Sequence, residues 1–234
     1  MRGALRFLST VLMLAGALLL ADAVLTVVWQ EPVSALMAKR SQAQLSGQLD
    51  DRERQLLQPA EVQALRALPD TQRRLAYAAR RLQEQTPVGD AIGRIEMPTI
   101  GKSFVVVAGD DPDALRKGPG AYPQTPLPGR GGTTAIAGHR TTYLAPFRDI
   151  DDLHRGDEIH LKMPYGRFTY RVQGQQIVKP TQVSVIDPVG YERLVLTACH
   201  PLYSAAERIV VSARLIRVVP SQRIADVERR PNSR

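Results

Sequence analysis

The sequence has 234 residues, of which 44% are hydrophobic, so it can bury the core of one sizeable domain with accessory segments. The formal net charge of +8 is spread along the chain, and no segment resembles a basic DNA-reading helix or an aromatic RNA platform. Binding to nucleic acid is therefore not expected. Cys199 is the only cysteine, which excludes an intrachain disulfide.

The first segment is an apolar run over residues 7–29, long enough to cross a bilayer as a helix, which needs ~20 residues. Arg2 and Arg6 precede the run and Glu31 follows it, so the positive-inside rule predicts a cytoplasmic N-terminus and an extracellular remainder. A cleaved secretory signal ending at "ADA" (21–23) is the alternative. The apolar run continues past that site, which favours an uncleaved anchor over residues 1–29.

Residues 30–88 are predicted to form a partly helical stalk. "SQAQLSGQLDDRERQLLQ" is polar and charged, whereas "DTQRRLAYAARRLQEQ" predicts a short amphipathic helix with Asp70 as its N-cap. Leu75, Ala79 and Leu82 would share one face of that helix. The sequence leaves open whether the helix packs on the following domain or only spaces it from the membrane.

Residues 89–219 change to short apolar runs separated by glycine and proline, a pattern typical of a closed or nearly closed β-barrel. Residues 158–178 predict a hairpin around "PYGR". "RLVLTAC" predicts a buried strand that ends at Cys199, and "RIVVSARLIRVV" predicts another that begins at Arg208. The polar tail, residues 220–234, is expected to be flexible.

Three reactive side chains lie at or beside predicted strand ends. A thiol is nucleophilic only as the thiolate, and an ordinary free cysteine has a pKa of ~8.5, so Cys199 needs a basic or cationic partner. His139 follows the strand in "AIAGHRTTY", and Arg208 lies nine residues after Cys199. Each residue alone is typical of a structural role, but the three together indicate a catalytic cysteine site outside the membrane.

Two segments carry a resemblance to a known family. "TTAIAGHRTTYLAPFRDIDDLHRGDEI" and "LVLTACHPLYSAAERIVV" resemble the histidine and cysteine regions of sortases, most closely the class E sortases of high-GC Gram-positive bacteria. "IGRIEMPTIGKSFVVVAG" is similar to the opening strands of that family. The resemblance covers about residues 90–218.

The resemblance implies a mainly β fold, a closed eight-stranded barrel with short helices, tethered by the anchor and stalk. It also implies a cysteine transpeptidase that needs no cofactor or metal. Cys199 would attack the Thr–Gly carbonyl of a Leu-Ala-x-Thr-Gly or Leu-Pro-x-Thr-Gly sorting signal and form a thioacyl-enzyme. His139 would be general acid and then base, and Arg208 would hold substrate and stabilise the oxyanion.

The implied partners are secreted proteins with a sorting signal, together with an amine of a peptidoglycan precursor or of a pilin. Thr197, Ala198 and Tyr143 are expected to contact the substrate. Two positions depart from the family pattern: Ala198 stands where threonine is common, and Leu144 where glycine is common.

Several other residues near the three reactive side chains admit a different interpretation. His200 adjoins Cys199, but neighbouring strand residues point to opposite faces, so His139 is the better partner. The acidic run "RDIDDLHRGDE" lacks the spacing of a calcium loop, so a polar turn is expected, with His154 and His160 at the surface. An L,D-transpeptidase would require Ser-x-Gly-Cys. The alternative function is a non-catalytic, membrane-tethered barrel that binds cell wall or a partner protein.

Overall fold

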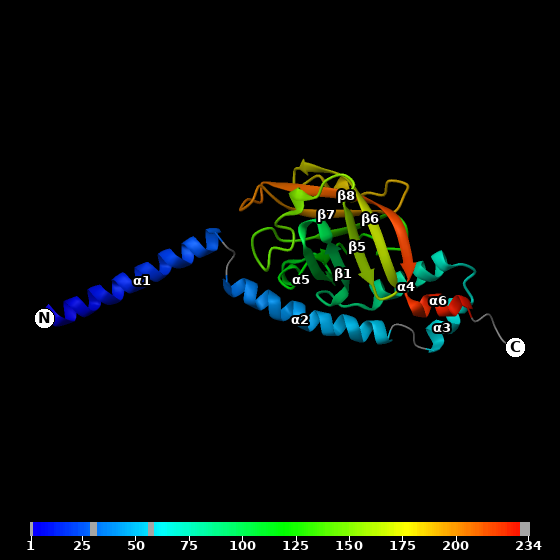
Figure 1. The fold of residues 1–234 in the computed structure, drawn as a ribbon, viewed down its shortest axis with the longest axis horizontal. Coiled ribbons are helices and arrows are strands. Elements are labelled where there is room, and N and C mark those ends of the chain that lie inside the picture. The colour runs from blue at the N-terminus through cyan, green and yellow to red at the C-terminus, as the bar shows by residue number, and fades with distance from the viewer. Residues whose placement is uncertain (1, 29–31, 56–58, 230–234) are drawn as a thin grey trace.

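A computed structural model describes residues 2–28, 32–55 and 59–229. Within them, eight strands form a closed barrel in the order β1-β2-β3-β4-β7-β8-β6-β5, which confirms the expected fold (Figure 1). The strands are β1 (Ala91–Met97), β2 (Lys102–Ala108), β3 (Gly120–Ala121), β4 (Thr133–Ala137), β5 (Glu158–Met163), β6 (Gly166–Val178), β7 (Arg193–His200) and β8 (Glu207–Pro220).

Six α-helices lie outside the barrel wall in the described part of the chain. They are α1 (Arg2–Val28), α2 (Pro32–Gln55), α3 (Pro59–Arg66), α4 (Thr71–Gln85), α5 (Pro112–Leu115) and α6 (Gln222–Arg229), with short 3-10 turns at Pro98–Ile100, Ile150–Asp152 and Val183–Ile186. Residues 3–23 of α1 are long and apolar enough to cross a membrane. This helix fits the expected single-pass anchor, whose last predicted residue, 29, lies outside the described residues.

The predicted hairpin is present. β5 and β6 pair antiparallel from Glu158↔Arg171 to Met163↔Gly166, so only two residues join them. β6 continues and pairs with β8 over nearly its whole length, and these two long strands curve around one side of the barrel (Figure 1).

Alternation along β7 and β8 fixes which side chains face inward. Leu194, Leu196 and Ala198 lie in the main core cluster, as do Ile209, Val211 and Ala213 of β8. Val195 and Val210 belong instead to a separate cluster on the outer face, with Ala135 and Val178. Because successive strand residues point to opposite faces, Cys199 shares the outer face with Val195 and Thr197.

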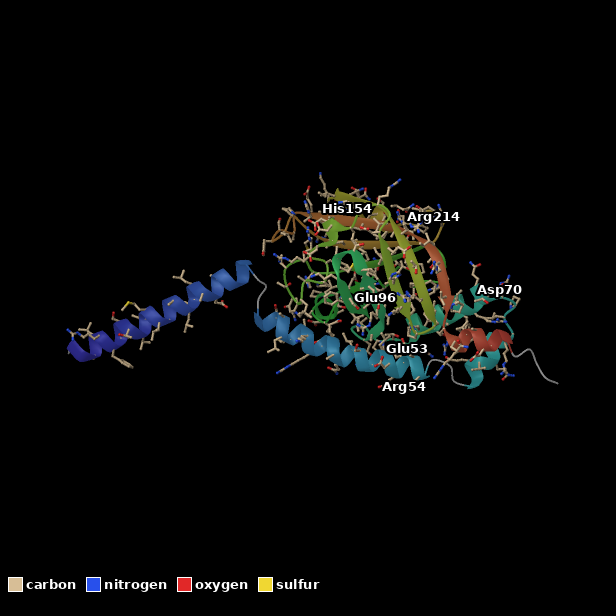
Figure 2. The ribbon with its side chains drawn as sticks, viewed as in Figure 1. Glu53, Arg54, Asp70, Glu96, His154 and Arg214 are labelled. Carbon is tan, nitrogen blue, oxygen red and sulfur yellow. The ribbon has the colours of Figure 1, made fainter. Side chains whose placement is uncertain are left out.

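Helix α4 confirms the amphipathic prediction and answers the question that the sequence left open. The Asp70 carboxylate accepts a hydrogen bond from the backbone N–H of Arg73 at 2.8 Å and caps the helix (Figure 2). Leu75, Ala79 and Leu82 are buried in the main core cluster. The helix therefore packs on the barrel.

Helix α2 also packs on the barrel, so the segment predicted as a stalk is part of the folded unit. Leu45 and Leu49 are buried against Ala91, Val105 and Val107 of β1 and β2. At the end of α2, Arg52 forms an ion pair with Asp90 at 3.0 Å and donates a hydrogen bond to Thr86.

The tail expected to be flexible is helical over residues 222–229, which corrects that prediction; residues 230–234 lie outside the described part. Ile224 is fully buried in the main core cluster and Val227 lies beside it. α6 contacts α3 and α4 as well as the end of β8. Two apolar residues one turn apart are enough to fix this short helix because the barrel and the neighbouring helices surround them.

Candidate active site

The end of β7 pairs Cys199 directly with Arg208 of β8. Residues opposite one another in an antiparallel pair project to the same face, so the side chains of Cys199 and Arg208 leave the sheet side by side on the outer face. The preceding pair, Ala198↔Ile209, points into the core. The predicted neighbourhood of Cys199 and Arg208 is therefore present.

His139 reaches the same place through β4. β4 runs parallel to β7 in the register Ala135↔Val195 to Ala137↔Thr197, and the Gly138 N–H continues the ladder to the Thr197 carbonyl at 3.1 Å. The next residue, His139, therefore stands level with the end of β7. The central strand thus carries the thiol, with the imidazole on one flank and the guanidinium on the other.

Arg208 is half-buried, and part of its guanidinium is hydrogen-bonded to the backbone of the turn that precedes it. Its Nη1 donates to the carbonyls of Ala205 at 3.0 Å and Glu207 at 2.9 Å. A guanidinium has five N–H donors, so these bonds orient the group without exhausting it.

His139 is half-buried beside an aromatic ring. The rings of His139 and Tyr143 lie 5.3 Å apart, centroid to centroid. Burial lowers the pKa of His139 below its usual range, and the positive charge of Arg116 lowers it further. Near neutral pH the imidazole is therefore mainly neutral and able to accept a proton.

Arg140 ties the histidine loop to the cysteine strand. The sequence did not predict this role, although Arg140 directly follows His139. The Arg140 side chain is 2% exposed and pairs with Asp151 at 2.6 Å. It also donates twice to the Arg148 carbonyl and to Nδ1 of His200 at 3.3 Å. The residue after His139 is thus bonded to the residue after Cys199.

A hollow of about 330 Å³ opens beside Cys199. Neither His139 nor Arg208 lines it, so it meets the three reactive residues only at the thiol. Two loops form its walls: Arg140, Thr141 and Thr142 after β4, and Pro201, Tyr203, Ser204 and Ala205 after β7.

The residues expected to contact substrate are placed differently from one another. Ala198 is buried in the core, so any contact that it makes with substrate is through its backbone. Thr197 is also buried, and its hydroxyl is hydrogen-bonded to the Tyr122 hydroxyl at 2.9 Å. Tyr143 contacts His139 and begins three positive-φ residues, 51° there and 65° at Leu144. Glycine adopts a positive φ without strain, which explains why position 144, occupied here by leucine, suits a glycine.

The acidic run near residue 150 is used in internal contacts. Asp149 pairs with Lys102 at 3.1 Å and Asp151 pairs with Arg140. Asp157 accepts a hydrogen bond from the backbone N–H of His154, an exposed residue. This is the polar turn that the sequence predicted.

Comparison with known proteins agrees with this geometry. A family model described as "Sortase domain" matches residues 95–216. Sortase D of Bacillus subtilis is 37% identical over 114 residues, which is 48% of this chain and 56% of that protein. Sortase SrtE1 of Streptomyces coelicolor is 31% identical over 100 residues, 39% of this chain and 28% of that protein.

A solved structure shares the fold. Sortase E from Streptomyces avermitilis is 36% identical with a TM-score of 0.53, and the match covers 57% of this chain and 93% of that one. By contrast, the chain spans about half the length of one curated relative and less than a third of the other. The stretch that the family model matches, residues 95–216, contains His139, Cys199 and Arg208.

Proposed function

Because this chain belongs to the sortase family, we propose that it is a membrane-anchored cysteine transpeptidase that cleaves a C-terminal sorting signal and joins the protein to an amine. The observation that carries this proposal is the pairing at one barrel end. Cys199 is opposite Arg208, and the β4–β7 ladder brings His139 level with both.

In the first half-reaction, the Cys199 thiolate attacks the carbonyl carbon between threonine and glycine of the signal. A carbon–sulfur bond forms and the carbonyl oxygen becomes an oxyanion, which the Arg208 guanidinium stabilises. The carbon–nitrogen bond then breaks as His139 gives its proton to the departing amine. The products are a thioacyl-enzyme and the released C-terminal peptide.

In the second half-reaction, an incoming amine attacks the thioacyl carbon and His139 takes its proton. The carbon–sulfur bond breaks and the thiolate is restored. The low pKa of His139 suits this step because the neutral imidazole is the form that accepts a proton.

The signal is proposed to be of the Leu-Ala-x-Thr-Gly or Leu-Pro-x-Thr-Gly type, as in class E relatives. The amine would belong to a peptidoglycan precursor or a pilin. Arg2 and Arg6 before the apolar run support a cytoplasmic N-terminus and an extracellular barrel.

The test uses a panel of Leu-x-x-Thr-Gly peptides with candidate amines, scored for cleavage and ligation by mass spectrometry. A thioacyl adduct on Cys199 is the expected intermediate, and Cys199→Ala should abolish it. Arg208→Lys should reduce kcat by roughly 10²-fold, the usual effect of losing one oxyanion donor.

Arg171→Lys is the matched control, because Arg171 is an exposed arginine of β6 whose ion pair with Glu158 lies away from the thiol. An unreactive Cys199 with every peptide, in a folded protein, would instead favour the non-catalytic binding module.

A further inference from the structure

The start of α2 must lie close to the membrane if α1 spans it. Only residues 29–31 separate Val28 of α1 from Pro32 of α2. Four Cα–Cα steps extend at most about 15 Å. This covalent limit holds whatever angle the two helices adopt.

Exposed apolar and basic residues gather at that end of α2. Leu36 is 54% exposed and Met37 is 62% exposed, and Lys39 and Arg40 follow within one turn, both exposed. On the other face of the same turns, Ala38 is buried. Apolar side chains beside cations are typical of helices that lie at the surface of an anionic bilayer.

The same end of α2 points toward the active-site end of the barrel. β8 begins at the active-site end and runs away from it. Its neighbour β6 is antiparallel to β8, β5 is antiparallel to β6, and β1 is antiparallel to β5. After these three reversals β1 runs toward the active-site end. α2 runs opposite to β1, because Ser46 contacts Arg94 whereas Arg52, further along, contacts Asp90. Figure 1 shows the start of α2 and the β7–β8 turn toward the same end of the molecule.

Gln42 fastens α2 to the segment that borders His139. Its side-chain amide bonds both the N–H and the carbonyl of Val105 and also the carbonyl of Lys117, at 2.7, 3.1 and 2.8 Å. Val105 pairs with β1 on one edge of β2, but β3 has only two residues and does not reach Val105 on the other edge, where the Gln42 amide takes the place of a strand. The neighbouring Arg116 is close enough to lower the pKa of His139.

We propose that residues 32–40 of α2 bind the surface of the anionic bilayer that α1 spans, and that α2 thereby holds the active-site end of the barrel beside the membrane. Leu36 and Met37 enter the interfacial region while Lys39 and Arg40 pair with lipid phosphates. Resting on the proposed function, this orientation would hold Cys199 within reach of the amine of a peptidoglycan precursor carried on a membrane lipid.

The first experiment measures depth with the full chain in vesicles of phosphatidylglycerol and phosphatidylcholine. A fluorophore is attached at Met37→Cys or, as control, at Ile216→Cys, each in a Cys199→Ser background. Ile216 is an exposed residue near the opposite end of β8. A quencher carried on the lipid should reduce emission at position 37 several-fold more than at position 216. Equal quenching at the two positions would overturn the proposal.

The second experiment tests the charges. Lys39→Glu with Arg40→Glu should abolish the difference in quenching between positions 37 and 216 in anionic vesicles, since each cation near such a surface contributes a factor of about five to binding. Arg80→Glu with Arg217→Glu makes the same change in net charge at exposed positions elsewhere, and should leave the difference intact. The reverse pattern would contradict a surface role for residues 39 and 40.

The third experiment separates this inference from the proposed function. The Lys39→Glu, Arg40→Glu protein should cleave a soluble sorting peptide at the unaltered rate but ligate to a lipid-carried amine about 25-fold more slowly, the product of two such factors. Unchanged ligation would refute the orienting role. If the unaltered protein cleaves no peptide, the proposed function fails, whereas the quenching result stands by itself.

Discussion

Arg140 is the residue whose removal should most directly disturb the alignment of His139 with Cys199. Its planar fork bonds Asp151, the Arg148 carbonyl and His200 at once, which the single ammonium of lysine cannot reproduce. We expect Arg140→Lys to lower kcat by about tenfold or more with little change in KM, because small misplacements of reacting groups are costly.

Steady-state kinetics on peptide and amine would check this, with thermal unfolding measured in parallel. Arg171→Lys again provides the exposed control. A fall in melting temperature with unaltered kcat would show that Arg140 stabilises the fold without positioning the site.

Arg116 should tune the pH dependence of the reaction. Its charge is one of the two causes that lower the pKa of His139. Replacing Arg116 with glutamine removes that cause, so the pKa of His139 rises toward its ordinary value. Activity falls at low pH as the group of the Cys199–His139 pair with the lower pKa becomes protonated. A higher pKa of His139 should therefore move the acid limb of the pH profile to higher pH.

The profile of kcat/KM against pH would reveal the shift. Lys179→Gln, which alters an exposed cation in the loop after β6, should leave the acid limb in place. An acid limb that does not move in Arg116→Gln would exclude His139 as the group that it reports.

The placement of Cys199, Arg208 and His139 at neighbouring strand ends was predictable, because the apolar runs in the sequence mark where those strands begin and end. The roles of Arg140 and Tyr122 were not, because they depend on partners distant in sequence. Arg140 meets His200 sixty positions later, and Tyr122 meets Thr197 seventy-five positions later. No local pattern encodes such a contact.

Helix α6 should contribute measurably to stability although it contains only eight residues. Ile224 is fully buried among barrel residues. Ile224→Ala should lower the free energy of unfolding by about 2–5 kcal/mol, the usual cost of such a cavity. Asp226→Ala on the exposed face of the same helix should change it by less than about 0.5 kcal/mol. Chemical denaturation of both variants would compare them, and equal small effects would mean that α6 is not docked in solution.

The predictions for the helices succeeded where periodicity was strong. α4 places Leu75, Ala79 and Leu82 on one face, and its burial follows from that pattern. α2 attaches through two leucines and otherwise through polar side chains such as Gln42 and Arg52, so its sequence resembles a solvated spacer. A polar contact to an unpaired strand edge has no hydropathy signature, and this is why the docking of α2 was missed.

At the scale of the whole molecule, removal of the anchor and removal of the docked helix should have different effects. A chain that begins at Pro32 keeps Leu45 and Leu49 against β1 and β2. A chain that begins at Pro59 loses both, at about 1.5–3 kcal/mol for each buried leucine. The shorter chain should therefore melt roughly 10 °C lower, at 2–4 °C per kcal/mol.

Differential scanning calorimetry of the two chains would measure this. Equal melting temperatures would show that α2 adds nothing to the stability of the barrel.

Strands β4 and β7, which pair in parallel, are separated in sequence by the 55 residues 138–192, which include the whole β5–β6 hairpin. Their ladder forms only after the intervening chain has folded back, since a parallel pair cannot be made by a tight turn. Until that ladder forms, His139 is apart from Cys199, although the local β7–β8 pairing can already hold Arg208 opposite the cysteine. In a half-folded polypeptide Cys199 therefore lacks the imidazole that we propose as its proton-transfer partner, and the proposed reaction has to wait for completion of the fold.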